Sequence, residues 1–298
     1  MWGCGKVYRI HSEQLPSDEI LKKEILDSVG DLPPMPQAMQ KAREILADPN
    51  SSFKDLAIVL VSDQAIAAKV LKLANSAYYG LSKRVSSIKH AAVVLGYRTI
   101  AELVSLAATS KLMGNALNGY GLKAGELWHH SLAVAFGARF IANKKHTELL
   151  DDAFTAGLIH DVGKLVLDAH ILKRRQAFED LMAGSRGGFL IAERHILGLD
   201  HAETAFEVCK RWNLPADMST GIRYHHDPAG SQGSELANIL HVADGLAIMS
   251  GLGAGIDALS YKMDDSAVRF LSLRRPELEK IMKQVVASVH RTTEEFRE

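Results

Sequence analysis

Cysteine is scarce in this sequence of 298 residues, which contains only Cys4 and Cys209. Two cysteines cannot form a disulfide framework, so we expect a protein of the reducing cytoplasm. No apolar run reaches the roughly 18–20 residues that a membrane-spanning helix needs, and we therefore expect no membrane insertion. Residues 1–10 also lack the apolar stretch of a signal peptide.

The formal net charge is zero, because 35 Lys and Arg residues balance 35 Asp and Glu residues. A protein that binds DNA or RNA directly needs a basic face, so this balance predicts no direct nucleic-acid binding. A disordered composition is also excluded, since 47% of the residues are hydrophobic and can form a sizeable core.

Strand patterns are equally rare. The alternation of apolar and polar residues between turns that is typical of β-strands is hard to find. Helical spacing is common instead, and Ile66, Val70 and Leu73 share one face of a predicted helix over residues 65–74. We therefore predict an all-α protein.

Turn-forming residues indicate how the chain divides. The segment from Gly114 to Gly125 contains four glycines and two asparagines, which makes it the best candidate for a boundary between two lobes. We predict an N-terminal helical lobe over residues 1–115 and a helical bundle over residues 116–260. Further helices over residues 261–298 should pack on that bundle.

Histidine is concentrated in the second half of the chain, where ten of the 13 histidines lie between His129 and His241. Together with carboxylates they form an ordered series of metal-type ligands. Imidazole combined with carboxylate suits Fe, Mn, Zn or Ni better than Mg or Ca. The series consists of Glu126, His130, His160, Asp161, His201, His225, His226 and Asp244.

Taken one at a time, several of these residues have plainer interpretations. Glu126 and His130 are four residues apart and would share a helix face, but a Glu/His pair at this spacing usually lies on the protein surface. A lone histidine at a helix start, as expected for His201, is more often a surface residue. His225 and His226 cannot share a helix face, so both can bind metal only near a helix end or with two ions.

The pair His160 and Asp161 is more telling, because apolar residues on both sides predict a largely buried helix over residues 156–167. Burying an unpaired carboxylate costs on the order of several kcal/mol, so both side chains need a partner, either a metal ion or each other. Gly163 permits close approach of a neighbouring backbone. Lys164 shares the face of Asp161, where it would contact the phosphate of a ligand or neutralise Asp161.

Asp244 is a second carboxylate inside an apolar helical pattern. Its partner would be a metal ion, the backbone or a neighbouring histidine. His241, three residues earlier, would support the site or lie at the surface. Glu193, Glu203 and His195 are interpreted as parts of solvated helix faces.

Together these motifs resemble the HD superfamily of metal-dependent phosphohydrolases. The match is to its HDOD branch, the HD-related output domains of bacterial signalling proteins. The resemblance covers about residues 30 to 250, with several separate motifs in the right order. These motifs are Leu32–Pro36, Leu73–Gly80, Ile88–Thr99, Trp128–Ala135, Gly157–Leu167, Leu199–Glu203, Arg211–Pro215, His225–His226 and the stretch around Asp244.

The resemblance implies an HD-type bundle and a set of ligands. The HD pattern implies metal binding by His130, His160, Asp161 and Asp244. The similar HD-GYP phosphodiesterases add ligands that correspond to Glu126, His201, His225 and His226. The GYP signature expected after the paired histidines is absent, because residues 227–233 read DPAGSQG. This departure weakens cyclic-dinucleotide hydrolysis without affecting metal binding.

We therefore expect a cytoplasmic bacterial signal-transduction protein that holds one or two divalent transition-metal ions, with Fe or Mn favoured over Zn or Ni. It would act as a sensing or protein-interaction module on a signalling protein in trans, with a nucleotide or phosphate ligand at the metal site. The alternative is a metal-dependent phosphohydrolase or phosphodiesterase acting on a nucleotide or other phosphorylated signal. In that case Asp161, bridging two ions, and Lys164, contacting phosphate, would be the catalytic residues. HDOD proteins generally lack a demonstrated catalytic role, which favours the first expectation.

Overall fold

The computed structural model of the protein describes residues 18–48, 50–52, 56, 60, 63–184, 188–252, 255–257 and 262–294. Over these residues the regular structure is helical without any strand, and Leu117 and Leu122 form one isolated antiparallel bridge. The predicted all-α class is therefore confirmed. None of the helices within these ranges is long and apolar enough to cross a lipid bilayer.

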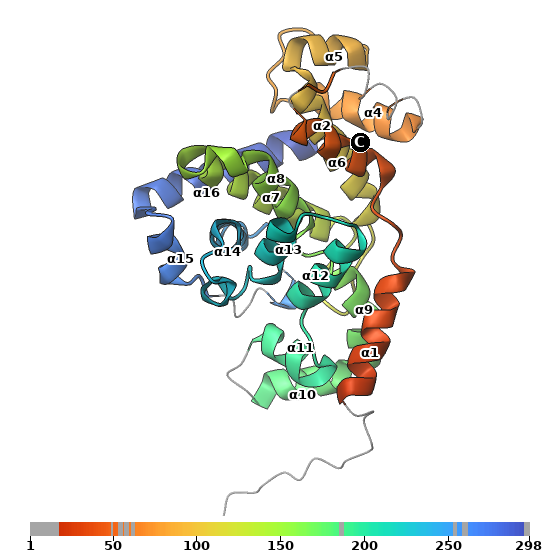
Figure 1. Ribbon diagram of the computed structural model, residues 1–298, viewed down its shortest axis with the longest axis vertical. Helices are drawn as coiled ribbons and strands as arrows, with labels where there is room; N and C mark the ends of the chain where they lie inside the picture. The colour runs from red at the N-terminus through yellow and green to blue at the C-terminus, as the bar shows by residue number, and fades with distance from the viewer. Residues whose placement is uncertain are drawn as a thin grey trace, which may run out of the picture.

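The upper part of the molecule in Figure 1 is built around α6, on which α2, α4 and α5 pack. α1 and a short 3-10 helix, η1, precede these helices in the chain. The bounds are α1 (Asp18–Ser28), η1 (Val29–Asp31), α2 (Gln37–Ala47), α4 (Gln64–Ala74), α5 (Ile88–Leu95) and α6 (Tyr97–Leu112).

The helix predicted over residues 65–74 is present as α4. The Asp63 carboxylate accepts hydrogen bonds of 3.0 Å from the backbone N–H groups of Ala65 and Ile66, and it thereby caps the helix start. Ile66, Val70 and Leu73 are all buried. Helical periodicity and a capping residue thus account for this element.

The remaining helices form a bundle around α7, with α8, α14 and α16 packed against it. Their bounds are α7 (Glu126–Lys145), η2 (Thr147–Leu149), α8 (Leu150–Ile159), α9 (Lys164–Lys173), α10 (Arg175–Gly184), α11 (Phe189–Leu197), α12 (His201–Arg211), α13 (Ala216–Arg223), η3 (Pro228–Ser231), α14 (Glu235–Met249), α15 (Asp265–Phe270) and α16 (Arg275–Thr293).

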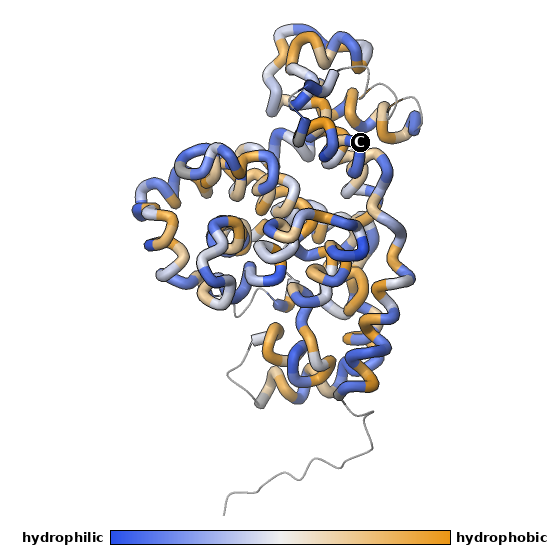
Figure 2. Tube along the Cα trace, viewed as in Figure 1, coloured by the Kyte–Doolittle hydropathy of each residue, from blue (hydrophilic) through white to orange (hydrophobic). Residues whose placement is uncertain are grey.

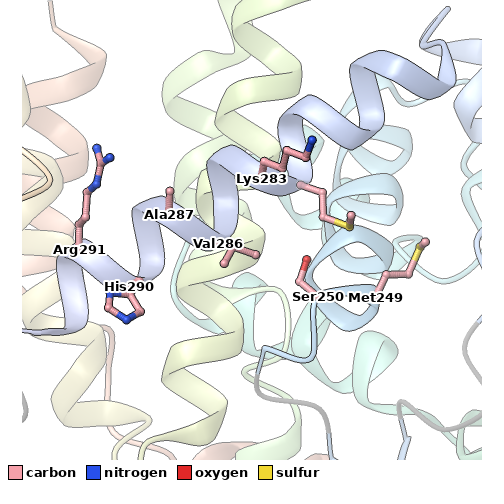
Figure 3. Close-up of a pocket in the computed structure, with 8 residues that line it drawn as sticks. Met249, Ser250, Lys283, Val286, Ala287, His290 and Arg291 are labelled. Atoms are coloured by element: carbon pink, nitrogen blue, oxygen red, sulfur yellow. The ribbon is translucent and has the colours of Figure 1, made fainter.

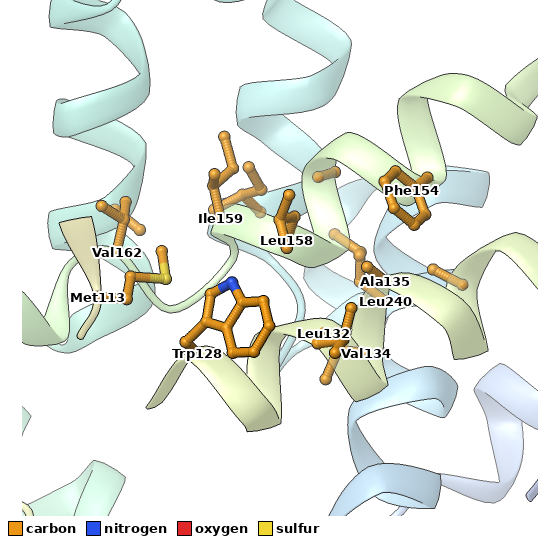
Figure 4. Packing of buried hydrophobic residues seen from close by; sticks show 14 of the residues in the cluster. Met113, Trp128, Leu132, Val134, Ala135, Phe154, Leu158, Ile159, Val162 and Leu240 are labelled. Carbon is orange, nitrogen blue, oxygen red and sulfur yellow. The ribbon is translucent and has the colours of Figure 1, made fainter. Parts of the chain in front are cut away.

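Close packing of α7 and α8 depends on Gly157. A Cβ atom at this position would lie 2.8 Å from the Cα atom of Ala135, so a larger residue would push the two helices apart. Buried side chains fill the space around this contact, among them Leu132 on α7, Leu158 on α8 and Leu240 on α14 (Figure 4). The functional side chains described below project from this rigid core.

Segments from both ends of the chain contact the bundle. α1 precedes the upper helices in sequence but lies beside α9 and α11 (Figure 1). The indole N–H of Trp212 donates a 3.3 Å hydrogen bond to the carbonyl of Pro33. Figure 2 shows apolar and polar segments alternating along the helices, as expected for amphipathic helices around a common core. The lobe boundaries near residues 115 and 260 remain predictions.

Candidate metal centre

Seven of the eight predicted ligands come together inside the bundle. They form three overlapping groups of three residues, and the donor atoms of each group lie within 4.8 Å of one another. Six of the seven residues are buried and His226 is partly buried. The seven residues, which we call the donor cluster, are His130 from α7, His160 and Asp161 from the turn after α8, His201 from the start of α12, His225 and His226 from the turn after α13, and Asp244 from α14.

Asp161 lies at the centre of the donor cluster. Its Oδ2 atom is 3.4 Å from Nε2 of His160 and 3.6 Å from Nε2 of His130. Its Oδ1 atom is 3.4 Å from Nε2 of His201 and 4.0 Å from Nε2 of His225. Each carboxylate oxygen therefore faces its own pair of imidazoles.

The continuous helix predicted over residues 156–167 is wrong, because α8 ends at Ile159 and residues 160–163 form a turn before α9. Nδ1 of His160 lies 2.8 Å from the carbonyl of Gly157. In an uninterrupted helix that carbonyl would accept a hydrogen bond from the backbone of Asp161. The His160 side chain takes the place of this backbone donor, and the turn directs His160 and Asp161 into the same interior space.

Gly163 allows the start of α12 to rest against this turn. A Cβ atom at Gly163 would lie 2.1 Å from the carbonyl oxygen of His201 and 2.7 Å from the backbone nitrogen of Ala205. The close backbone approach predicted for this glycine is therefore present. It brings His201 next to Asp161, and the side chain of Asp200 caps α12 by accepting a hydrogen bond from the backbone of the third helical residue.

Backbone carbonyls fix the orientation of three imidazoles in the donor cluster. A carbonyl only accepts hydrogen bonds, so each Nδ1 atom that contacts one carries a proton, and Nε2 keeps its lone pair when the ring is neutral. Histidines that bind metals are commonly oriented in this way. The three contacts join Nδ1 of His130 to Leu252 O at 3.1 Å, Nδ1 of His160 to Gly157 O at 2.8 Å, and Nδ1 of His225 to Ile222 O at 2.6 Å.

Burial keeps several of these imidazoles neutral. Burial, reinforced by the neighbouring His160, lowers the pKa of His225 to about 3. Burial also lowers the pKa of His160, and burial together with His225 holds the pKa of His226 well below its usual value. The lone pairs of these three rings are therefore available for a metal ion at neutral pH.

Glu193 is a functional residue that the sequence interpretation missed. It was expected on a solvated face, which is wrong, because its exposed fraction is 0%. Its Oε2 atom accepts hydrogen bonds from Nδ1 of His201 at 2.8 Å and from the backbone of His201 at 3.1 Å, and its Oε1 atom accepts one from the Tyr120 hydroxyl at 2.6 Å. A usable signal existed, since Phe189 and Leu197 lie four residues to either side and place Glu193 on the apolar face of α11.

Glu193 also determines the charge of His201. Burial opposes a charge on this imidazole, but the Glu193 carboxylate outweighs burial and raises the pKa of His201 to about 9. Nε2 of His201 lies 2.7 Å from Nε2 of His226, so protonated His201 donates a hydrogen bond to the neutral ring of His226. A metal ion that binds His201 through Nε2 must displace this proton.

His241 supports the donor cluster instead of lying at the surface. It is buried, its Nδ1 atom lies 2.8 Å from the carbonyl oxygen of His225, and its Nε2 atom accepts a 2.8 Å hydrogen bond from the backbone of Asp264. Asp244, one turn further along α14, has Oδ1 3.1 Å from Nε2 of His130. Burial would raise the pKa of Asp244, but the contact with His130 outweighs it and lowers that pKa to about 2.

Lys164 forms two ion pairs beside the donor cluster. Its Nζ atom lies 2.7 Å from Oδ2 of Asp161 and 2.5 Å from Oδ2 of Asp257, and it faces the ring of Tyr120. Burial opposes the charge of Lys164, but the two carboxylates outweigh burial and raise its pKa. Lys164 therefore neutralises Asp161. No local pattern predicted the role of Asp257, which is 93 residues away in the chain.

Glu126 is the predicted ligand that lies outside the donor cluster. Its Oε2 atom accepts a 2.7 Å hydrogen bond from the backbone of Lys123. It belongs to none of the groups of potential ligands that include the other seven residues. Its carboxylate thus contacts the turn that precedes its own helix, α7, one turn before His130.

Several polar atoms of the donor cluster are buried without a well-directed hydrogen bond in the described part of the chain, although Oδ2 of Asp161 forms an ion pair with Lys164 and Oδ1 of Asp244 lies near Nε2 of His130. Buried polar groups almost always have partners, and a buried carboxylate without one is costly. Nitrogen and oxygen donors without partners, converging from the turn after α8, the turn after α13 and α14, fit a transition-metal ion. The atoms are Nε2 of His160, Oδ1 and Oδ2 of Asp161, Nε2 of His225 and Oδ1 of Asp244.

Comparison with known proteins identifies relatives of this chain. The HDOD domain model matches residues 32–228. An uncharacterized protein of Treponema pallidum is 24% identical over 208 residues, which make up 70% of this chain, and the chain spans 40% of the length of that relative. The crystal structure of an HDOD domain protein with unknown function from Geobacter sulfurreducens is 26% identical, with a TM-score of 0.72, over 94% of this chain and 98% of that chain.

A second solved structure, of a candidate signal transduction protein from Marinobacter aquaeolei, has the same fold, with 22% identity and a TM-score of 0.71. The alignment covers 93% of this chain and 64% of that chain. The family model spans more than half of the sequence, and it agrees with the resemblance carried by the motifs. The protein belongs to the HDOD family.

Proposed function

We propose that this protein is a signal-transduction module of the bacterial cytoplasm whose donor cluster holds one or two divalent transition-metal ions. The observation that carries the proposal is the set of buried, unpartnered atoms around Asp161. An ion would satisfy these atoms together, whereas the Lys164 ammonium contacts only Oδ2 of Asp161. Fe or Mn are favoured, and Zn or Ni also suit imidazole and carboxylate ligands.

If two ions bind, the two sides of Asp161 would divide the ligands between them. His130 and His160 face Oδ2, whereas His201 and His225 face Oδ1. Asp161 would bridge the two sides. His226 would complete the group with His201 and His225, and Asp244 the group with His160 and His225. When bound, the ions would polarise a phosphate or water and lower the pKa of that water.

Lys164 favours a sensing role over catalysis. Its buried ammonium group is held between Asp161 and Asp257, so a phosphate would compete with these two carboxylates for it. A nucleotide or phosphate ligand would have to displace Asp257 to reach Lys164. We therefore propose that such a ligand, if bound at the centre, changes the contacts of Lys164, and that the module acts on a signalling protein in trans.

The second candidate function is metal-dependent hydrolysis of a phosphorylated signal. It is favoured by the completeness of the donor cluster, which a purely structural module would not need. Asp161 would bridge the ions and Lys164, once released from Asp257, would contact the phosphate. The missing GYP signature opposes cyclic dinucleotides as substrates.

Two measurements on the same samples test the proposal. Metal content is measured after loading with iron, manganese, zinc or nickel, and hydrolysis of cyclic dinucleotides, mononucleotides and an aryl phosphate ester is then assayed. We expect one or two ions per chain and no turnover. Turnover that disappears in a folded Asp161→Ala variant would establish the second candidate instead, and a wild-type protein without bound metal would contradict both.

A further inference from the structure

A hollow of about 440 Å³ lies between the end of α14 and one face of α16 (Figure 3). Its apolar lining comes from Met249 on α14 and from Met282, Val286 and Ala287 on α16. Met249 is 68% exposed and Val286 is 40% exposed, which is unusual for large apolar side chains. We call this hollow the α14–α16 groove.

The rim of the α14–α16 groove is basic. Lys283, His290 and Arg291 line it, and no carboxylate does so among the described residues. His290 pairs with Glu294 at 3.0 Å, whereas the resolved ion pairs of the described chain include neither Lys283 nor Arg291. Within the described chain, two cations therefore stand beside an apolar groove without an ion pair of their own, and this combination favours an acidic partner.

The groove is connected to the metal centre through α14. Met249 lies five residues after Asp244 on this helix. The chain that leaves α14 returns to the donor cluster, since the carbonyl of Leu252 accepts the hydrogen bond from Nδ1 of His130. The groove and the donor cluster therefore share α14 and the hydrogen bond that follows it.

We propose that the α14–α16 groove binds an amphipathic helix of the signalling partner, with apolar residues on one face and acidic residues on the flanks. Methionine side chains adapt to varied apolar surfaces, and a helix laid in such a groove is a recurrent mode of recognition. A second copy of this chain is a poorer occupant, because it would present the same basic rim. The inference rests on the proposed signalling role and specifies its partner surface.

The test uses the full-length, metal-loaded protein and three synthetic helices. The helices share one face of leucine and methionine, and their flanks carry glutamate, glutamine or lysine. Methyl NMR of the methionines reports the binding site, and fluorescence anisotropy reports the affinity. We expect the methyl signals of Met249 and Met282 to shift with the acidic helix, and those of buried Met113 and Met218 to stay unchanged.

The expected order of affinity is glutamate, then glutamine, then lysine. Replacing both Lys283 and Arg291 with glutamate should weaken the acidic helix by at least about tenfold and reverse this order. Met249→Glu should abolish binding. Lys89→Glu, an exposed charge reversal on α5, should have no effect and serves as the matched control.

Three results would overturn the inference. They are the absence of binding by any of the three helices, equal binding to the wild type and the groove variants, and shifts confined to methionines elsewhere. Binding of anionic vesicles that Met249→Glu removes would assign the groove to a membrane surface, and a dimer dissolved by the same variant would assign it to a second copy. Metal content is measured for every variant. A protein that binds metal but no helix would contradict only the proposal for the groove, and a protein without metal would contradict the proposed metal centre.

Discussion

Helix α7 carries two buried polar clusters that differ in one respect. Near its start, His130 belongs to the donor cluster, where five buried atoms lack hydrogen bonds. Further along, Arg139 forms an ion pair with Glu102 of α6, and neither side chain has a buried atom without a partner. The two clusters lie on one helix in one core. The packing of that helix therefore does not explain why only one cluster lacks hydrogen-bond partners. The satisfied pair holds α6 and α7 together, whereas the unsatisfied cluster needs a group from outside the chain.

The largest expected effect concerns the satisfied pair. Arg139→Met leaves the Glu102 carboxylate buried without its partner and should lower the free energy of unfolding by about 3–5 kcal/mol. Replacing Glu102 by leucine in addition should recover most of this loss. Chemical denaturation measures both. Metal content should stay at the wild-type level, and a loss of metal in Arg139→Met would show that the two clusters are not independent.

The next effect concerns the unsatisfied cluster. At a metal concentration about 100 times the dissociation constant, binding should stabilise the wild-type protein by about 2.7 kcal/mol. Asp161→Ala should remove this stabilisation completely, because it removes the carboxylate that faces both pairs of imidazoles. Thermal unfolding with and without manganese or iron reads out the effect. If the metal stabilised the variant and the wild type equally, it would bind at a place other than the donor cluster.

A smaller effect is expected from Glu193, which orients a ligand without belonging to the donor cluster. Glu193→Gln should weaken metal affinity by about 10–100-fold, because the charge that orients His201 is lost. The matched control is Glu203→Gln, since Glu203 is partly exposed and its carboxylate lies 3.7 Å from Arg223. Competition with a metal-chelating dye measures the affinities. If both variants lost the same metal affinity, the effect of Glu193 would come from its charge in general and not from its contact with His201.

The smallest effect is expected from Glu126. Glutamine at this position can still accept the hydrogen bond from Lys123, so Glu126→Gln should change metal affinity by less than about threefold, or about 0.6 kcal/mol. The same dye competition is the assay. A loss of tenfold or more would place Glu126 among the ligands, as the resemblance to HD-GYP phosphodiesterases implies.

Local features of the sequence predicted much of this molecule. The spacing of Ile66, Val70 and Leu73 predicted α4, and the helix start expected at His201 is the start of α12. Buried carboxylates in apolar segments drew attention to Asp161 and Asp244. These inferences succeeded because helix periodicity, capping and burial cost act over a few residues.

Other features depend on contacts between distant segments, which one sequence does not reveal. The turn at residues 160–163 exists because the His160 side chain replaces a backbone donor and α12 packs against Gly163. The pairing of Lys164 with Asp257 joins segments on opposite sides of α14 in the chain. The burial of Glu193 could have been predicted from its place on the apolar face of α11. Its charge indicated an exposed side chain instead.

Anomalous diffraction shows whether the unsatisfied atoms around Asp161 bind a transition metal. Crystals of the metal-loaded protein are measured on both sides of the absorption edge of manganese, iron, zinc or nickel. We expect one or two anomalous peaks in contact with the Asp161 carboxylate and with imidazole Nε2 atoms of the donor cluster. Peaks that avoid Asp161, or no peak at saturating metal, would show that these atoms do not bind the ion.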